Sequence, residues 1–301
     1  MPVEEALNQK KVAAENIKIT TADPFSIGRI GVIGVGAMGR PLVKRLKSRG
    51  FDVAAYVRRD ETKVELDAMG VTLEPSVTAL AKGRDFIVIY VYTDEQARKV
   101  VLEDGLIEAM EPGAMLIIHT TASPRTVQDI GARGEQTGVR VVDAGGSWGP
   151  DCVALGTMTL MVGGTAEDVA RCMPVFETYA YPIHHMGPLG AGMEMKLINN
   201  AVLGAHLRVA SEVLRIGRDL GLDTYRLLRG LTYCTGGSTA MQVMGNAVTE
   251  EQFWEYIGRF LYKDISVVNA LADQLGIDLG LIGEINKPLM ERLRTQHQHC
   301  E

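Results

Sequence analysis

Between residues 29 and 121 the chain alternates short apolar runs with stretches of helical periodicity, and this alternation limits the folds available to it. Four runs have the length and composition of buried strands: RIGVIG, DVAAYV, DFIVIYV and AMLIIHT. Strands that alternate with helices form parallel sheets, so the pattern predicts an α/β fold with a Rossmann-type doubly wound sheet. The runs VRVVDAG, MTLMVGG and YPIHHMG extend this predicted sheet to residue 187.

After Gly192 the strand pattern ends and helical periodicity continues. The first helical run, from about Met193 to Leu220, is longer than most globular helices, which is typical of an element joining two domains. More helices are predicted near residues 224–230, 239–245, 250–275 and 280–295. We therefore predict a polar extension (residues 1–27), a Rossmann domain (28–191) and an all-helical domain for substrate binding and dimerisation (192–301).

The composition narrows the class of partner. A formal charge of −6 over 301 residues argues against nucleic acid, whose phosphates require a basic surface. The longest apolar run, FIVIYVY, is too short to span a bilayer, and the N-terminus lacks the apolar core of a signal peptide. The four cysteines form no C-x-x-C pair, and the terminal HQHC is more typical of an exposed tail than of a metal site. We predict a cytoplasmic protein with a small-molecule substrate, no metal, and no nucleic-acid or membrane partner.

The segment GVIGVGAMGRP carries Gly34, Gly36 and Gly39 in G-x-G-x-x-G spacing, after a predicted strand and before a predicted helix. In this context the first glycine makes the turn, the second admits a pyrophosphate, and the third lets helix and strand pack closely. The segment predicts a dinucleotide site. Its expected cofactor-binding residues include the two that lie between the glycines, Ala37 and Met38, and two at the end of the strand DFIVIYV, Val91 and Tyr92.

The end of the second strand, AAYVRRDE, indicates which dinucleotide binds. Arg58 and Arg59 occupy the place where NAD-binding proteins carry an acidic residue, and guanidinium groups suit the extra phosphate of NADP. Asp60 could still turn inward and favour NAD. We predict NADP, with NAD as the alternative.

Residues 145–149, GGSWG, match the G-x-S-x-G pattern of hydrolase nucleophiles, which requires a helix after the serine. Pro150 follows at once and the next regular segment has a strand pattern, so we expect no helix and no nucleophile at Ser147. The segment is expected to be a glycine-rich loop that binds an anion such as a carboxylate.

Four motifs in order resemble the β-hydroxyacid dehydrogenase family, the relatives of 3-hydroxyisobutyrate dehydrogenase, tartronate semialdehyde reductase and the glyoxylate reductases. They are GVIGVGAMGRP, TTASP, DAGGSWGPDCVALGTMTLMVGG and GPLGAGMEMKLINN, and YKDI at 262–265 matches a fifth. The resemblance covers about residues 29–290.

The resemblance implies a role for each matching position. Lys196 matches the catalytic lysine and Asn200 the substrate-orienting asparagine, while Thr121 and Lys263 match cofactor contacts. The substrate loop would comprise Ser147, Trp148 and Gly149, although Trp148 replaces a family glycine and leaves the substrate open. The resemblance also implies a homodimer or homotetramer.

Lys196 and Asn200 are four residues apart and therefore share one helix face. A lysine whose pKa is lowered by burial and a neighbouring cation such as Lys263 can exchange the proton of an alcohol, and the asparagine can hold the hydroxyl. We expect the glycines at 187, 190 and 192 to let the chain approach the nicotinamide.

The preferred hypothesis is an NADP-dependent oxidoreductase that acts on a 3-hydroxy acid or reduces the corresponding aldehyde or keto acid. An imine reductase on the same fold is an alternative, although those enzymes usually carry another residue at the lysine position. A non-catalytic dinucleotide-binding protein is a second alternative. The presence of both Lys196 and Asn200 argues against it.

Overall fold

The computed structural model describes residues 28–247 and 249–298. The predicted extension over residues 1–27 and Cys300 of the HQHC tail lie outside these ranges. The described residues divide into two compact units, which we call the sheet unit (28–196) and the helical unit (197–298).

The sheet unit is built on eight strands in the order β3-β2-β1-β4-β5-β6-β7-β8. They are β1 (Arg29–Ile33), β2 (Asp52–Tyr56), β3 (Thr72–Leu73), β4 (Phe86–Ile89), β5 (Met115–Ile118), β6 (Arg140–Ser147), β7 (Met158–Gly163) and β8 (Ala180–Gly187). The first six run parallel to one another, with Ile30 of β1 opposite Val53 of β2 and Phe86 of β4.

The last two strands depart from a wholly parallel sheet: β7 runs antiparallel to β6, and β8 runs parallel to β7. The connection between β6 and β7 spans residues 148–157. This is shorter than the crossover of roughly a dozen residues or more that a parallel pair needs. The sheet is therefore mixed at one edge.

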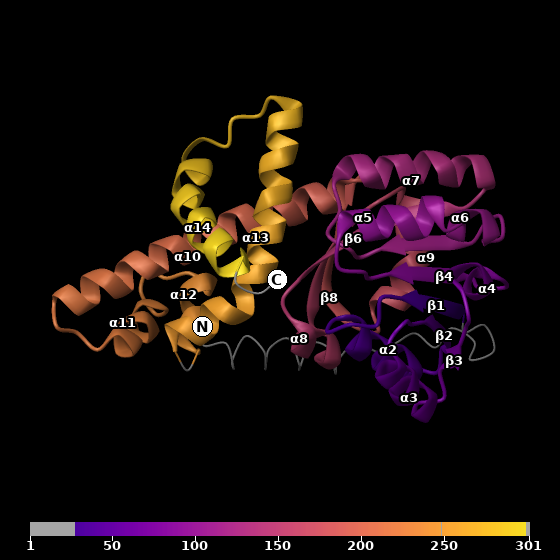
Figure 1. The fold of residues 1–301 in the computed structure, drawn as a ribbon, viewed down its shortest axis with the longest axis horizontal. Helices are drawn as coiled ribbons and strands as arrows, with labels where there is room; N and C mark the ends of the chain where they lie inside the picture. Colours follow the sequence, from indigo (N-terminus) through magenta and orange to yellow (C-terminus); the bar gives the residue numbers. More distant parts are fainter. Residues whose placement is uncertain (1–27, 248, 299–301) are drawn as a thin grey trace. The chain divides into compact units, whose positions relative to one another are not determined.

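Helices cover both faces of this sheet. They are α2 (Gly39–Ser48), α3 (Asp60–Ala68), α4 (Val77–Ala81), α5 (Asp94–Arg98), α6 (Leu106–Ala109), α7 (Pro124–Thr137), α8 (Pro150–Leu155) and α9 (Ala166–Phe176), with a π-helical segment at Lys99–Glu103. Figure 1 shows α5, α6 and α7 together on one face, with α2 and α3 on the other. Ile87 and Ile89 of β4 pack in the same core as α4 to α7, while Val88 points to the opposite face and is also fully buried.

The helical unit carries most of one long helix and four further helices: α10 (Ala191–Asp219, which begins in the sheet unit), α11 (Thr224–Leu231), α12 (Thr239–Gly245), α13 (Glu250–Leu275) and α14 (Gly280–Gln298). Its core surrounds Trp254 of α13, which packs with Leu207 of α10 and Leu289 of α14. A Rossmann-type sheet followed by an all-helical part confirms the predicted fold class, and α10 is the predicted long helix.

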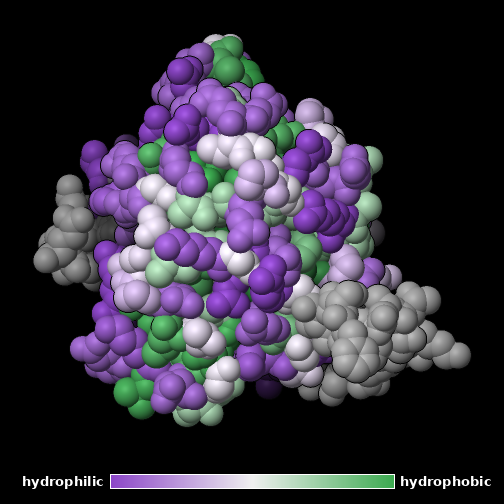
Figure 2. All heavy atoms as spheres, turned by 90° about the vertical axis from the view of Figure 1, so that its right-hand side faces the viewer, coloured by the Kyte–Doolittle hydropathy of each residue, from purple (hydrophilic) through white to green (hydrophobic). Residues whose placement is uncertain are grey.

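Figure 2 views the molecule from the side on which Figure 1 draws the sheet unit. Hydrophilic side chains predominate there and the hydrophobic ones form small separate patches. Within the described ranges, no helix is both long enough and apolar enough to cross a membrane.

Candidate active site

The glycine segment lies between β1 and α2 and is shaped by close backbone contacts. Gly34 has a φ of +96°, and a Cβ there would collide with the carbonyl of Tyr90 and lie 2.7 Å from the nitrogen of Val91. A Cβ on Gly39 would collide with the carbonyl of Gly34. These two glycines therefore serve the turn and the packing between helix and strand, as the spacing predicts.

Gly36 differs, because no heavy atom lies within 4 Å of the position of its missing Cβ. The protein itself would therefore not exclude a side chain at position 36, and this space is open to a ligand. At the start of α2, the N-cap residue Met38 makes no side-chain capping hydrogen bond, and the first turn holds no acidic residue. With exposed Ala37 beside it, this helix N-terminus suits an anionic pyrophosphate.

Residues from the neighbouring strands β4 and β5 lie at the same edge of the sheet. β4 pairs with β1 on one side and β5 on the other, so the segments after these strands meet at the carboxyl edge, where the strand order reverses. Val91 lies against Gly34, Thr121 follows β5 and is half-buried, and Tyr92 is exposed. The predicted cofactor residues of the sheet unit therefore follow adjacent strands.

The two arginines predicted to choose the dinucleotide follow β2. Both are exposed, and Arg59 is the N-cap residue of α3. Within residues 28–247 and 249–298, neither guanidinium forms an ion pair. Asp60 is 90% exposed and pairs with Lys63 at 2.8 Å, so in this structure it does not turn inward.

The expectation that no helix follows Ser147 is wrong. The helix α8 begins at Pro150 and ends before Gly156, whose φ is +75°. Proline in the first turn and glycine after the last turn are a normal start and stop for a helix, and this signal was present in the sequence.

The described residues nevertheless do not present Ser147 as a hydrolase nucleophile. Ser147 remains in the ladder opposite Thr159, and the strained backbone position is Trp148, with a φ of +86°. No histidine among the described residues hydrogen-bonds Ser147. The expected loop over residues 145–149 is therefore wrong for residues 145–147, which belong to β6. Ser147 and Gly149 are half-buried, and Trp148 is 39% exposed.

Lys196 lies against strand β6, where α10 packs on the sheet. A Cβ on Gly145 would lie 2.7 Å from Cβ of Lys196 and 3.2 Å from its Cγ. The lysine stem therefore passes directly over the strand that leads to Ser147. Lys196 itself is half-buried.

Gly192, the last of the glycines before Lys196, has a packing role that the sequence did not reveal. A Cβ on Gly192 would collide with the carbonyl of Met161 in β7, and one on Gly163 would collide with Asp143. Gly192 thus lets the start of α10 approach the sheet backbone. This approach accounts for Gly192 without the nicotinamide contact that we expected.

In the helical unit, Asp264 connects two predicted site residues. The amide nitrogen of Asn200 donates a hydrogen bond to one oxygen of Asp264, and Lys263 Nζ lies 3.1 Å from the other oxygen. Asn200 also accepts a hydrogen bond from the Asn199 amide at 3.0 Å and is 4% exposed. Asp264 was not among the predicted site residues, although YKDI contains it.

Two buried polar groups of the sheet unit were also missed. Asp143 of β6 accepts hydrogen bonds from the backbone at the start of α10, and His119, just after β5, bonds Ala144 and Tyr179. Both lie inside otherwise apolar strand runs. A polar residue within a buried apolar run needs hydrogen-bond partners. The positions of Asp143 in VRVVDAG and of His119 in AMLIIHT could therefore have indicated buried hydrogen-bonded groups.

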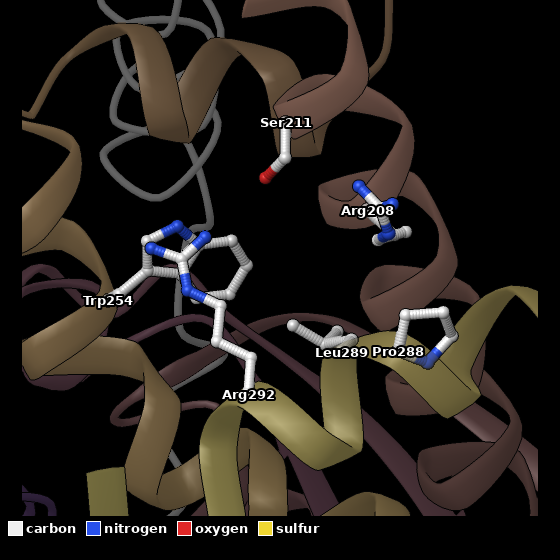
Figure 3. Close-up of a pocket in the computed structure, with 6 residues that line it drawn as sticks. All are labelled: Arg208, Ser211, Trp254, Pro288, Leu289 and Arg292. Atoms are coloured by element: carbon white, nitrogen blue, oxygen red, sulfur yellow. The ribbon is translucent and has the colours of Figure 1, made fainter. Parts of the chain in front are cut away.

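The helical unit contains a cavity of about 210 Å³, shown in Figure 3 and lined by Arg208, Ser211, Trp254, Pro288, Leu289 and Arg292. The guanidinium of Arg292 stacks over Trp254 at 4.8 Å, and its Nη1 lies 3.4 Å from Glu250 Oε1. Arg208 pairs with Glu212 at 2.5 Å. None of the sequence motifs includes these residues, and both cations already have carboxylate partners. Elsewhere in the described ranges, no group of acidic, histidine and cysteine side chains could hold a metal ion.

Comparison with known protein families agrees with this geometry. Residues 29–187 match the NAD binding domain of 6-phosphogluconate dehydrogenase, and residues 190–300 match the family described as the NAD-binding domain of NADP-dependent 3-hydroxyisobutyrate dehydrogenase. Together the two matches cover most of the chain.

Individual relatives point to the same family. The chain is 32% identical to the L-threonate dehydrogenase of Cupriavidus necator, over 86% of this chain and 85% of that one. It is 26% identical to the 3-hydroxyisobutyrate dehydrogenase of Pseudomonas aeruginosa, over 89% and 94%. The structure of the Mycobacterium tuberculosis 3-hydroxyisobutyrate dehydrogenase with L-serine superposes with a TM-score of 0.79 at 23% identity, covering 88% of this chain and 93% of that one. The chain belongs to the β-hydroxyacid dehydrogenase family of NAD(P)-binding oxidoreductases.

Proposed function

We propose that the protein is an NADP-dependent 3-hydroxyacid dehydrogenase or reductase, with Lys196 as its general acid and base. The observation that carries this proposal is the contact of the Lys196 stem with Gly145, two residues before Ser147. It brings a proton-transfer group together with a loop suited to a carboxylate, within one compact unit.

The chain's own residues have separate tasks in this reaction. When bound at the glycine segment, the oxidised cofactor would supply a hydride acceptor for the alcohol carbon, and the reduced cofactor would supply a hydride donor for the reverse direction. Lys196 takes the hydroxyl proton on oxidation and returns it on reduction. Ser147 and Gly149 hold the substrate carboxylate, and Trp148 forms a wall of the substrate site.

Asn200 lies one helical turn beyond Lys196 on α10. We propose that it orients the substrate hydroxyl, and that Asp264 fixes its amide through the hydrogen bond described above. Lys263 contacts the cofactor in this proposal.

The preference for NADP is supported by the exposed arginines after β2 and by the pairing of Asp60 with Lys63. Guanidinium groups without an ion-pair partner among the described residues are available to a phosphate dianion. The family matched by residues 190–300 is described by its NADP-dependent 3-hydroxyisobutyrate dehydrogenase, and this description supports the same choice.

We also propose that residues 192–301 form the substrate and dimerisation domain, and that the protein is a homodimer or homotetramer in the cytoplasm. Several large apolar side chains of the helical unit are exposed, and they are Leu220, Leu222, Tyr233, Leu275, Ile277 and Leu281. Light scattering at several protein concentrations tests the assembly, and a monomer throughout would contradict it.

The test of the reaction follows reduced-nicotinamide absorbance with a panel of small and aryl-substituted 3-hydroxy acids, offering NADP and NAD separately. We expect turnover that prefers NADP and that falls to a small residual rate in Lys196→Ala. Lys99→Ala is the matched control, because Lys99 is an exposed lysine of the same unit that pairs with Asp104. Turnover of imines alone, or full activity in Lys196→Ala, would contradict the proposal.

A further inference from the structure

The buried carboxylate of Asp143 bonds to the first residues of α10. Asp143 lies in β6 and is 0% exposed. Its Oδ1 accepts the backbone N–H of Gly190 and its Oδ2 accepts that of Met193, each at 2.7 Å. Both oxygens therefore serve N–H groups that the helix itself leaves without partners at its start.

Two glycines, Gly163 and Gly192, lie against the Asp143 carboxylate, where any side chain would collide with it or crowd it. A Cβ on Gly163 would collide with Oδ1, and a Cβ on Gly192 would lie 2.8 Å from Oδ2. Two elements distant in sequence thus leave room for the same carboxylate. The close approach of α10 to β6 and β7 depends on all three residues.

The same strand also contacts the stem of Lys196. Asp143 and Gly145 are two residues apart in β6, so they face the same side of the strand. Met193, the residue bonded by Asp143, is three residues before Lys196 on α10, nearly one turn. The start of α10 is therefore anchored to Asp143 of β6, and Lys196 lies over Gly145, the next residue on the same face of that strand.

We propose that Asp143 is a positioning residue, whose carboxylate fixes the N-terminus of α10 on β6 and thereby sets the place of Lys196 for proton transfer. This inference rests on the proposed role of Lys196. A displacement of about 1 Å in a reacting group can lower a rate about 100-fold, so the anchor affects kcat through geometry alone.

The test compares Asp143→Asn with Asp168→Asn. An asparagine has one acceptor oxygen and can satisfy only one of the two N–H groups. We expect kcat to fall about 10- to 100-fold in Asp143→Asn, with KM for NADP unchanged. Asp168 is also a buried carboxylate at a helix start, bonded by Thr165 of the α9 cap and by Arg140, but no predicted site residue follows it on that helix. Its variant should lose thermal stability while kcat stays unchanged.

A double-mutant cycle with Lys196→Ala separates positioning from a general loss of structure. If Asp143 acts through Lys196, Asp143→Asn will not further lower the residual rate of Lys196→Ala. Equal losses in both backgrounds, or an unchanged kcat in folded Asp143→Asn, would overturn the inference.

A second variant covers the case in which Asp143→Asn does not fold. Gly163→Ala keeps the carboxylate but forces it to move, and we expect lower kcat with unchanged KM for NADP. Full activity of folded Gly163→Ala would also overturn the inference. Hydrogen exchange at the amides of Gly190 and Met193 should be faster in both variants, and it reports on the anchor without any assay of turnover. Full activity of Lys196→Ala with normal protection of these amides would instead refute the proposed function and leave the anchor intact.

Discussion

The Nε2 atom of His119 lies 2.8 Å from the hydroxyl of Tyr179, and both side chains are buried in the sheet unit. His119 Nδ1 lies 2.6 Å from the carbonyl oxygen of Ala144, which can only accept, so Nδ1 carries a proton. Because burial lowers the pKa of His119 to about 4, Nε2 is unprotonated near neutral pH and accepts from the Tyr179 hydroxyl. The imidazole is therefore neutral and both nitrogens are satisfied. This network joins β5, β6 and the segment before β8, and it explains a buried histidine without a catalytic role.

The neutral imidazole predicts loss of stability in acid. Burial lowers the pKa of His119 from 6.5 to about 4, so between these values the unfolded chain holds a proton that the folded chain lacks. Stability is complete above about pH 6.5, and about 3 kcal/mol is lost as the pH falls to 4. In His119→Gln, the slope of unfolding free energy against pH should drop by up to about 1.4 kcal/mol per pH unit in this range, measured by urea denaturation. An unchanged slope would contradict a neutral His119.

Asp143 predicts an effect of opposite sign. Burial raises its pKa from 3.8 to about 6, although the two backbone hydrogen bonds oppose the shift. Here the folded chain holds the extra proton, so this contribution favours folding below pH 3.8 and about 3 kcal/mol of it is lost as the pH rises through 6. Asp143→Asn removes this titration, so stability should rise more steeply with pH than in the unmodified protein. A less steep rise in the same urea measurements would show that the pKa is not raised.

Two glycines of the cofactor segment should respond differently to alanine. Gly36→Ala meets no protein atom, so its stability should stay within about 0.5 kcal/mol while NADP binding weakens at least tenfold, roughly 1.4 kcal/mol, because the methyl group occupies the place of the pyrophosphate. Gly39→Ala collides with the Gly34 carbonyl and should lose about 1–3 kcal/mol of stability. Thermal unfolding and fluorescence titration with NADPH measure the two effects. Normal NADPH affinity in Gly36→Ala would exclude the segment as the phosphate site.

The arginines after β2 should determine the choice of dinucleotide. Replacing Arg58 and Arg59 by alanine should raise KM for NADP about tenfold or more and leave KM for NAD nearly unchanged, because only NADP carries the extra phosphate. Arg49→Ala is a suitable control, since Arg49 is an exposed arginine at the end of α2. Equal changes for both dinucleotides in steady-state kinetics would argue against phosphate recognition here.

The backbone conformation at position 148 should favour glycine over other residues. Its φ of +86° lies in the left-handed region, which costs a non-glycine residue about 1–2 kcal/mol. Trp148→Gly should therefore be more stable than Trp148→Ala by about 1 kcal/mol, and both should accept bulkier hydroxy acids than the unmodified enzyme, because loss of the indole enlarges the proposed substrate site. Thermal unfolding and the substrate panel check the two expectations. Equal stability of both variants would show that the loop relaxes without strain.

Local sequence was sufficient for most of the fold. The long helix predicted from Met193 to Leu220 spans Ala191–Asp219, and the strand pattern of VRVVDAG, MTLMVGG and YPIHHMG corresponds to β6, β7 and β8. The glycine segment was also placed correctly between a strand and a helix. Periodicity and turn residues carry this information because they act over a few neighbouring positions.

The roles that depend on contacts across the chain were settled only by tertiary structure. Asp143 accepts hydrogen bonds from Gly190 and Met193, which lie 47 and 50 residues away in the sequence. Gly163 and Gly192 have no side chain at the places where α10 packs on the sheet backbone. The antiparallel direction of β7 likewise follows from the short connection between β6 and β7. The sequence by itself determined most of the helices and strands and the dinucleotide segment, although its interpretation missed α8. The partners of each buried polar group were decided by packing, because a single sequence contains no record of which distant residues meet.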